Sequence, residues 1–298
     1  MMRAVALGGG HGLAASLKAA HAVADEVTAI VGVADNGGSS GRLREFWRGC
    51  PALGDARLTV SNLLGQDSPL AQLLEYRFRT GELAGHALGN LILFGLLEKT
   101  GALDAALREL GVLSNLSTTV LPVSNAPLEL RGVDTSGQPL VGQLAVHWSP
   151  AVAKVWVVPE AAPLAEVVDA LLHADLIILG PGSLYTSVLA TALAPGVADG
   201  ISSSKGMVVF VANLAPQEAE TRGYDQRRTL EALLAHNVVP DVVLVHRDAV
   251  GAAWHGQPFS GGPRHLELKL SEDGLVHSPV LLADALARAL GGDGESAR

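Results

Sequence analysis

The chain has 298 residues, of which 48% are apolar, and its formal net charge is −9. This composition favours a compact domain over a disordered chain, and the lack of a basic run excludes a nucleic-acid interface built on a basic patch. The single cysteine, Cys50, excludes an internal disulfide. No apolar stretch reaches the ~20 residues that span a bilayer, and no charged leader is visible. From these three observations together we expect a cytoplasmic protein.

The first 35 residues predict a βαβ unit. A short apolar run over residues 3–7 is typical of a buried strand, and the glycine-rich turn GGGHG follows it. Apolar residues at positions 13, 17, 20 and 23 then share one face of a helix. The run VTAIVGVA over 27–34 is rich in β-branched residues and predicts a second strand.

The rest of the chain alternates between helices and strands, with a strand-rich middle. We expect helices over 41–48, 59–64, 70–77 and 88–98, then four strand-like runs between residues 117 and 159 with a hairpin turn at 134–137. Strands over 175–179, 207–212 and 241–246 alternate with helices over 183–193 and 225–236, before a polar strand HLELKL and a last helix over 279–290. This order predicts an α/β fold: one doubly wound domain over 1–290, an inserted antiparallel patch around 115–158, and a frayed tail over 291–298.

Four of the expected strands end in loops rich in glycine and polar residues, over residues 8–12, 34–44, 180–187 and 213–221. Ligands of open parallel sheets bind outside the carboxyl ends of the strands, where such loops meet. Glycines let backbone N–H groups approach a phosphate, and a following helix presents its positive N-terminus. The four loops together predict an anion-binding cleft.

The first two loops leave alternatives open. Gly10-x-Gly12-x-x-Ala15 fits the dinucleotide fingerprint, with Asp35 where a ribose-binding carboxylate would lie, so an NAD-dependent oxidoreductase is one hypothesis and a ligand-free tight turn is another. The loop DNGGSSGR is longer than an ordinary strand-to-helix connection and contains the groups of an anion cradle. Its G-x-S-x-G pattern around Ser39 also fits a serine hydrolase, but the strand ends several residues before the nucleophile position.

Two further polar groups stand before helical runs. Asp55 and Arg57 fit either a helix cap with a surface charge or a ligand site. His86 and Asn90 begin an otherwise apolar helix, where they either cap it or face a ligand. The other histidines are scattered, which argues against a structural zinc site.

Seven ordered blocks resemble a known family: ALGGGHGL, VGVADNGGSSGRLR, PALGDARLTV, LAGHALGNL, VLPVSNAPLEL, ADLIILGPGSLYTSVL and NLAPQEAETRGY. They are similar to the gluconeogenesis factors (YvcK-like), relatives of the 2-phospho-L-lactate transferases (CofD-like), over roughly residues 3–247. The resemblance implies a Rossmann-like three-layer αβα fold with a mostly parallel sheet, and a nucleotide diphosphate in the cleft. YvcK-like members bind UDP-sugars and are linked to carbon metabolism and cell shape, whereas CofD-like members transfer a phosphate-linked group from a nucleotide-activated donor with magnesium.

The loop at 180–187 resembles the YvcK-like form. Three positions depart from the family: Asn36 replaces an aspartate, His11 replaces a threonine, and residues 213–217 differ from the usual Met-Thr-Gln form. An amide is a poorer metal ligand than a carboxylate, so these departures weaken transferase chemistry more than nucleotide binding.

The resemblance therefore implies a nucleotide-sugar-binding regulator, with a homodimer as its assembly. Alternatives are a magnesium-dependent transferase of a phospho-group and, less well supported, an NAD-dependent oxidoreductase. Candidate catalytic residues are Asp35, Asn36 and Asp55, and the candidate metal ligands are Asp35 and Asp55. The expected ligand-binding residues are Gly8, Gly9, Gly10, His11, Gly12, Leu13, Asp35, Asn36, Gly37, Gly38, Ser39, Ser40, Arg42, Arg57, His86, Asn90, Gly180, Pro181, Gly182, Ser183, Tyr185, Thr186 and Asn213.

Overall fold

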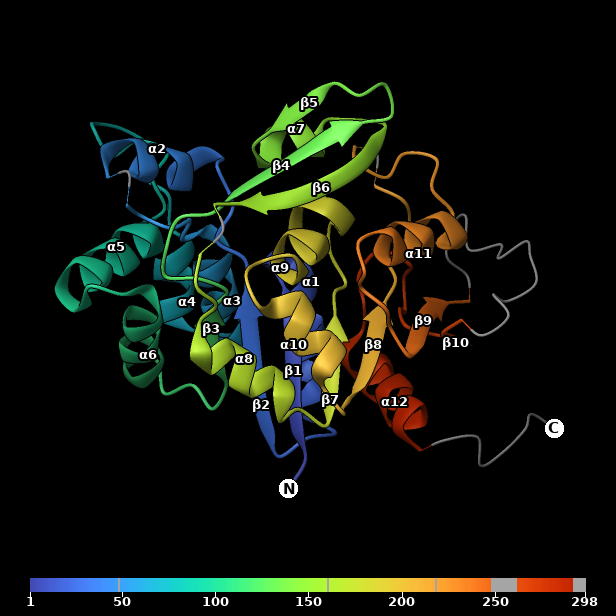
Figure 1. The fold of residues 1–298 in the computed structure, drawn as a ribbon. Helices are drawn as coiled ribbons and strands as arrows, with labels where there is room; N and C mark the ends of the chain where they lie inside the picture. The colour runs from blue at the N-terminus through green and yellow to red at the C-terminus, as the bar shows by residue number, and fades with distance from the viewer. Residues whose placement is uncertain (48, 160, 218, 248–261, 292–298) are drawn as a thin grey trace.

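A seven-stranded, fully parallel sheet forms the centre of the molecule (Figure 1). The computed structural model describes residues 1–47, 49–159, 161–217, 219–247 and 262–291. The strands lie in the order β10-β9-β8-β7-β1-β2-β3. Their bounds are β1 (Arg3–Gly8), β2 (Glu26–Val31), β3 (Thr119–Pro122), β7 (Leu176–Leu179), β8 (Met207–Val211), β9 (Val242–His246) and β10 (Arg264–Leu268). The expected tail falls on residues 292–298, outside the described residues.

Helices cover both faces of this sheet, as the apolar character of its strands predicts. On one face α1, α3 and α12 pack together; on the other lie α8, α9 and α10, with α8 against β3 and α9 against β1 (Figure 1). These helices span α1 (Gly10–Ala20), α3 (Gly54–Leu64), α8 (Ala165–Leu172), α9 (Ala190–Ala192), α10 (Val197–Ser203) and α12 (Pro279–Leu290). The remaining helices span α2 (Gly38–Phe46), α4 (Pro69–Glu75), α5 (Leu88–Thr100), α6 (Leu103–Leu113) and α11 (Gln226–Ala235). The α/β prediction is confirmed.

A second sheet of three antiparallel strands, β5-β4-β6, lies over the carboxyl edge of the main sheet (Figure 1). It consists of β4 (Glu129–Asp134), β5 (Pro139–Val141) and β6 (Val152–Val158), with α7 (Gln143–His147) between β5 and β6. We call these four elements the lid. The predicted hairpin joins β4 to β5, and Asp134 stabilises it by accepting hydrogen bonds from the N–H groups of Ser136 and Gln138, both at 2.9 Å.

The middle of the chain differs from the prediction in two details. The first strand-like run, now β3, pairs with β2 in parallel and so extends the main sheet rather than the antiparallel patch. The third run gives only the short strand β5 before it turns into α7, because Gly142 adopts φ +83° between them. Glycine is the residue that takes this conformation without strain.

The helix expected over 183–193 begins as a π-helix, η1 (Leu184–Leu189), and continues as α9. The carbonyl of Ser183 accepts from the N–H groups of both Ser187 (3.1 Å) and Val188 (2.9 Å), which produces the wider turn. Hydrophobic spacing alone does not distinguish this turn from an ordinary helix, and π-turns occur often at functional sites.

A histidine directly after α11 holds the lid to the main body. His236 follows α11, and its Nε2 accepts a hydrogen bond from the N–H of Val155 on β6 at 3.0 Å. Its Nδ1 lies 2.7 Å from the carbonyl oxygen of Ala232, which accepts the ring proton. The contact with Val155 requires an unprotonated Nε2, and burial lowers the pKa of His236 accordingly, whereas the bond to Ala232 is compatible with either state of the ring.

Two other properties bear on experiments. Cys50 is fully buried, and burial raises the pKa of its thiol to about 11.

No single helix among the described residues is long and apolar enough to cross a bilayer, although the bent pair Leu184–Ala192 and Val197–Ser203 passes the test of length and composition when taken together.

Candidate functional site

The loops after β1 and β7 touch at the carboxyl edge of the sheet. A Cβ added to Gly12 would overlap the carbonyl oxygen of Pro181, so only glycine fits there. Ser16 on α1 donates a hydrogen bond to the carbonyl oxygen of Gly180 at 2.5 Å. These contacts join the loop of residues 8–12 and the loop of residues 180–183 into one wall. The side chain of His11 lies outside the described residues.

A pair of carboxylates lies beside this wall. A Cβ on Gly9 would overlap the carboxylate of Asp55, which the backbone N–H of Gly10 also contacts. Burial and the neighbouring charge of Asp35 raise the pKa of Asp55 to about 7. Asp35 in turn accepts a hydrogen bond from the N–H of Gly37 at 2.8 Å. Asp55, in the first turn of α3, therefore holds the loop after β1 and lies close enough to Asp35 to feel its charge.

The loop after β2 is fixed to the lid. The side-chain oxygen of Asn36 accepts from the N–H of Leu144 on α7 at 3.3 Å, and its amide lies against Gly142. Asn36 therefore turns toward the lid. Arg44, which no sequence pattern singled out, donates to the carbonyl oxygens of Asp35 (3.2 Å) and Leu128 (3.0 Å) and thus links the same loop to the chain before β4.

A serine, a histidine and an arginine gather at the first turn of α2. Ser39 Oγ lies 3.1 Å from Nδ1 of His86 and accepts from the N–H of Ala87 at 3.4 Å. A Cβ on Gly85 would lie 3.1 Å from the guanidinium of Arg42. Burial, with the charge of Arg42, lowers the pKa of His86. Ser39 is only 4% exposed, which suits a supporting role better than that of a hydrolase nucleophile.

Arg57 and Asn90 lie beneath the site and pair with one another. The Nε of Arg57 donates to the side-chain oxygen of Asn90 at 3.0 Å, and both residues are buried. Gly89 has no room for a side chain because Arg57 and the carbonyl oxygen of Leu74 occupy the space. These two expected ligand-binding residues connect α3 to α5.

The loop after β7 is supported by the loop after β8. Asn213 holds both sides of Gly182, accepting from its N–H at 3.0 Å and donating to its carbonyl oxygen at 2.8 Å. Glu220, which is fully buried, accepts from the N–H groups of Tyr185 and Thr186, both at 3.2 Å. Burial raises the pKa of Glu220 to about 7. The side chain of Tyr185 points into the core, where its hydroxyl lies 2.9 Å from that of Tyr224.

Glu220 is the residue that sequence reasoning missed. It lies in the quoted block NLAPQEAETRGY, but an acidic residue in a loop gives no sign of its partners. Its role depends on contacts over 34 and 35 positions of the chain.

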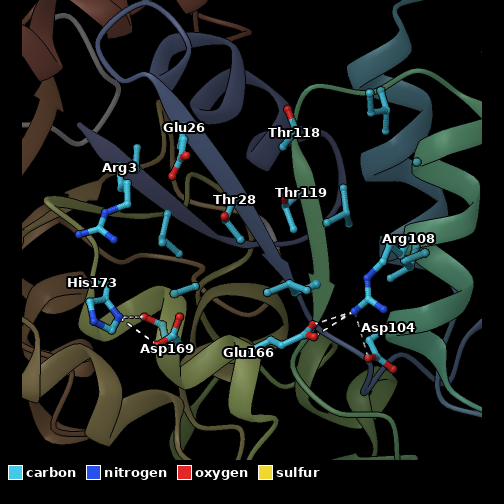
Figure 2. Close-up of a pocket in the computed structure, with 18 of the residues that line it drawn as sticks. Arg3, Glu26, Thr28, Asp104, Arg108, Thr118, Thr119, Glu166, Asp169 and His173 are labelled. Carbon is cyan, nitrogen blue, oxygen red and sulfur yellow. Dashed lines mark hydrogen bonds and ion pairs between the residues drawn. The ribbon is translucent and has the colours of Figure 1, made fainter. Parts of the chain in front are cut away.

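A large cavity lies elsewhere, at the opposite end of the sheet (Figure 2). It measures about 930 Å³ and lies over β1, β2 and β3 between α6 and α8. Its charged groups are largely paired: Arg108 contacts Glu166 at 3.0 Å and Asp104 at 3.6 Å, and His173 contacts Asp169 at 3.0 Å. Thr28 and Thr119 face it as register partners on adjacent strands. We interpret it as a solvated groove where no helix covers the sheet.

Comparison with known proteins decides the family. The family model described as 2-phospho-L-lactate transferase CofD matches residues 4–257. The chain belongs to the CofD family. The gluconeogenesis factor of Halalkalibacterium halodurans is 34% identical over 293 residues, covering 96% of this chain and 86% of the relative. The putative gluconeogenesis factor of Mycobacterium tuberculosis is 41% identical over 247 residues, covering 78% and 71%.

A solved structure supports the same assignment. A crystal structure of a Bacillus halodurans protein matches with a TM-score of 0.88 at 32% identity and covers 96% of this chain and 99% of the other. The resemblance stated from the sequence is therefore confirmed, and the parallel sheet with its small antiparallel companion is the architecture of this CofD family member.

Proposed function

We propose that this CofD family member binds a nucleotide-sugar in the cleft between the strand-end loops and the lid. The observation that carries the proposal is the contact between the loops after β1 and β7, where Gly12 meets Pro181. It brings two of the four expected loops into one wall. The lid contacts the loop after β2 through Asn36 and the loop after β7 through Gln143, which donates to the carbonyl oxygen of Thr186. A UDP-sugar, and a link to carbon metabolism and cell shape, are the finer form of this proposal.

The diphosphate is assigned to the first turns of α1 and α2. Neither helix has a side-chain cap or an acidic residue in its first turn. Unfilled N–H groups and the helix dipole make such turns favourable for an anion. Arg42 and His86 add cationic and donor groups beside α2.

Asp35 and Asp55 suit a magnesium ion. Magnesium commonly takes one or two carboxylates together with substrate phosphates and water. Among the described residues there is no cluster of three or more His, Cys, Asp or Glu side chains, so a ligand phosphate would have to complete the coordination. The ion would neutralise charge on the diphosphate. A bound cation would also lower the raised pKa of Asp55, because it favours the ionised carboxylate.

A second candidate is transfer of a phospho-group from a nucleotide-activated donor. The paired carboxylates and the description of the family model both favour it. In such a reaction an acceptor hydroxyl displaces nucleoside monophosphate from the phosphate–phosphate linkage of the donor. An NAD-dependent oxidoreductase is the weaker alternative.

Thermal unfolding with and without ligand tests the main proposal. UDP-N-acetylglucosamine at millimolar concentration is expected to raise the Tm by several degrees, since a ligand that binds only the native state stabilises it. NADH serves as the control and should give no shift. An unchanged Tm with UDP, UDP-N-acetylglucosamine and magnesium would contradict the proposal, and magnesium-dependent release of nucleoside monophosphate in the presence of an acceptor would favour the transferase. A homodimer is tested separately by light scattering.

A further inference from the structure

The backbone N–H groups of the loop after β7 are almost all occupied by protein acceptors. Within residues 180–188, Pro181 has no N–H, and the others donate as follows: Gly180 to Leu7 (3.1 Å), Gly182 to Asn213 (3.0 Å), Tyr185 and Thr186 to Glu220 (3.2 Å each), and Ser187 and Val188 to Ser183 (3.1 and 2.9 Å). The N–H of Leu184 also faces Glu220. Only the N–H of Ser183 lacks an assigned acceptor in this segment.

This arrangement differs from that of the first turn of α1. There, no residue of the first turn is acidic and no side chain caps the helix, and one N–H, that of Gly10, contacts the carboxylate of Asp55 on α3. At η1 a carboxylate from another loop occupies the position that an anion would take. The Glu220 carboxylate also places a negative charge behind the wall, which disfavours a second anion in front of it.

Glu220 cannot be explained as a surface charge. Its side chain is fully buried, and its carboxylate accepts hydrogen bonds from the N–H groups of two consecutive residues. A buried carboxylate is costly unless it is hydrogen-bonded. The N–H groups of Tyr185 and Thr186 therefore stabilise the carboxylate, and the carboxylate in turn fixes the position of these two residues. Asn213 acts in the same way on Gly182, through both of its side-chain atoms.

We infer that Glu220 and Asn213 make the loop after β7 a wall in which only the N–H of Ser183 lacks a protein acceptor, which positions the uncharged, hydroxyl-bearing part of the ligand, while the diphosphate lies on α1 and α2. This inference rests on the proposed nucleotide-sugar site and divides it into two subsites. The hydroxyl-bearing part is either the hexose or the ribose. Glu220 acts through the loop and is a positioning residue.

The test compares Glu220→Gln with the wild type. Glutamine keeps the shape of the side chain but replaces one acceptor oxygen with an NH₂ donor, so it can satisfy only one of the two N–H groups. Glu231→Gln is the matched control, because it removes an exposed carboxylate from α11 that pairs with Arg227. Dissociation constants are measured by calorimetry at pH 8 for inorganic pyrophosphate, UDP and UDP-N-acetylglucosamine. Asn213→Asp, which loses the donor to Gly182, provides an independent second variant.

The expected result is selective weakening. Loss of a hydrogen bond near a ligand costs about 1.4 kcal/mol, or about tenfold in affinity. Weakening for UDP-N-acetylglucosamine alone assigns the wall to the hexose, and weakening for UDP as well, with pyrophosphate unchanged, assigns it to the ribose. Equal weakening for all three, or tighter binding of pyrophosphate, overturns the inference. If the wild type binds none of the three, the proposed function itself fails.

Discussion

The side chain of Asn36 accepts a hydrogen bond from the backbone N–H of Leu144 and so joins the loop after β2 to the lid. The two residues are 108 positions apart in the chain. Because Asn36 lies directly after Asp35, the position of the lid and the position of the carboxylate pair are coupled. Several consequences of this coupling can be measured.

Replacing Asn36 by alanine should loosen the lid while leaving the main sheet unchanged. The variant loses one hydrogen bond, worth about 1 kcal/mol, and hydrogen exchange of the N–H groups in α7 should quicken several-fold. Ser202→Ala is a suitable control, since Ser202 bonds only within its own helix at an exposed position. Unchanged exchange in α7 would show that the lid is held elsewhere.

The stability of the ligand-free protein should fall as the pH rises toward 7. Asp55 has a raised pKa of about 7, so the native state keeps a proton that the unfolded chain releases near pH 4. The unfolded state therefore binds fewer protons between about pH 4 and pH 7, and the free energy of unfolding decreases across this window.

Asp55→Asn should remove the part of that dependence that Asp55 contributes, while Glu220, whose pKa is also raised to about 7, keeps its own part. The free energy of unfolding of the variant is expected to exceed that of the wild type by about 4 kcal/mol at pH 8 and to match it near pH 4, as measured by urea unfolding in a chelator. Magnesium should stabilise the wild type at pH 8 and leave the variant unaffected. Parallel stability curves for the two proteins would contradict the assignment of the pKa to Asp55.

The lid should detach in acid. His236 has a lowered pKa, so protonation is resisted in the native state but occurs near pH 6.5 in the unfolded chain. The stability contributed by the neutral ring is therefore lost as the pH falls below 6.5, because a protonated Nε2 can no longer accept the hydrogen bond from the N–H of Val155. Faster exchange of the β6 N–H groups at pH 5 than expected from intrinsic rates is the readout. His236→Asn is the comparison variant, and its exchange should not depend on this titration.

Gly12→Ala should separate the loops after β1 and β7. An added methyl group overlaps the carbonyl oxygen of Pro181, so one loop must move. We expect loss of nucleotide-sugar affinity by at least tenfold with a modest fall in Tm. Gly95→Ala, at a helical position with open space around it, is the control and should raise stability slightly. Equal affinity of Gly12→Ala and the wild type would remove this wall from the site.

Asn90→Ala should destabilise the fold strongly. It leaves the buried Nε of Arg57 without its acceptor, which costs about 2–4 kcal/mol. Lys99→Ala breaks an exposed pair with Glu109 and should cost less than about 1 kcal/mol. Similar urea midpoints for the two variants would argue that Arg57 is better solvated than its burial indicates.

The sequence predicted the parallel sheet because its strands are continuous apolar runs, and it predicted the strand-end loops because glycines mark them. It could not predict where the side chains in those loops turn. Asn36 and Arg57 fitted a ligand site by position, yet their hydrogen bonds go to the lid and to Asn90. Glu220 escaped notice because its partners are distant in sequence. Whether the expected residues bind a ligand stays a prediction.

The burial of Cys50 has a practical consequence. Its thiol has a pKa of about 11 and no exposed surface, so thiol reagents at neutral pH should leave it unmodified. A cysteine introduced at an exposed position such as Leu144 on the lid would then be the single labelled site. A fluorophore attached there would report lid movement during ligand titration in an otherwise unaltered protein, and the native cysteine could stay in place.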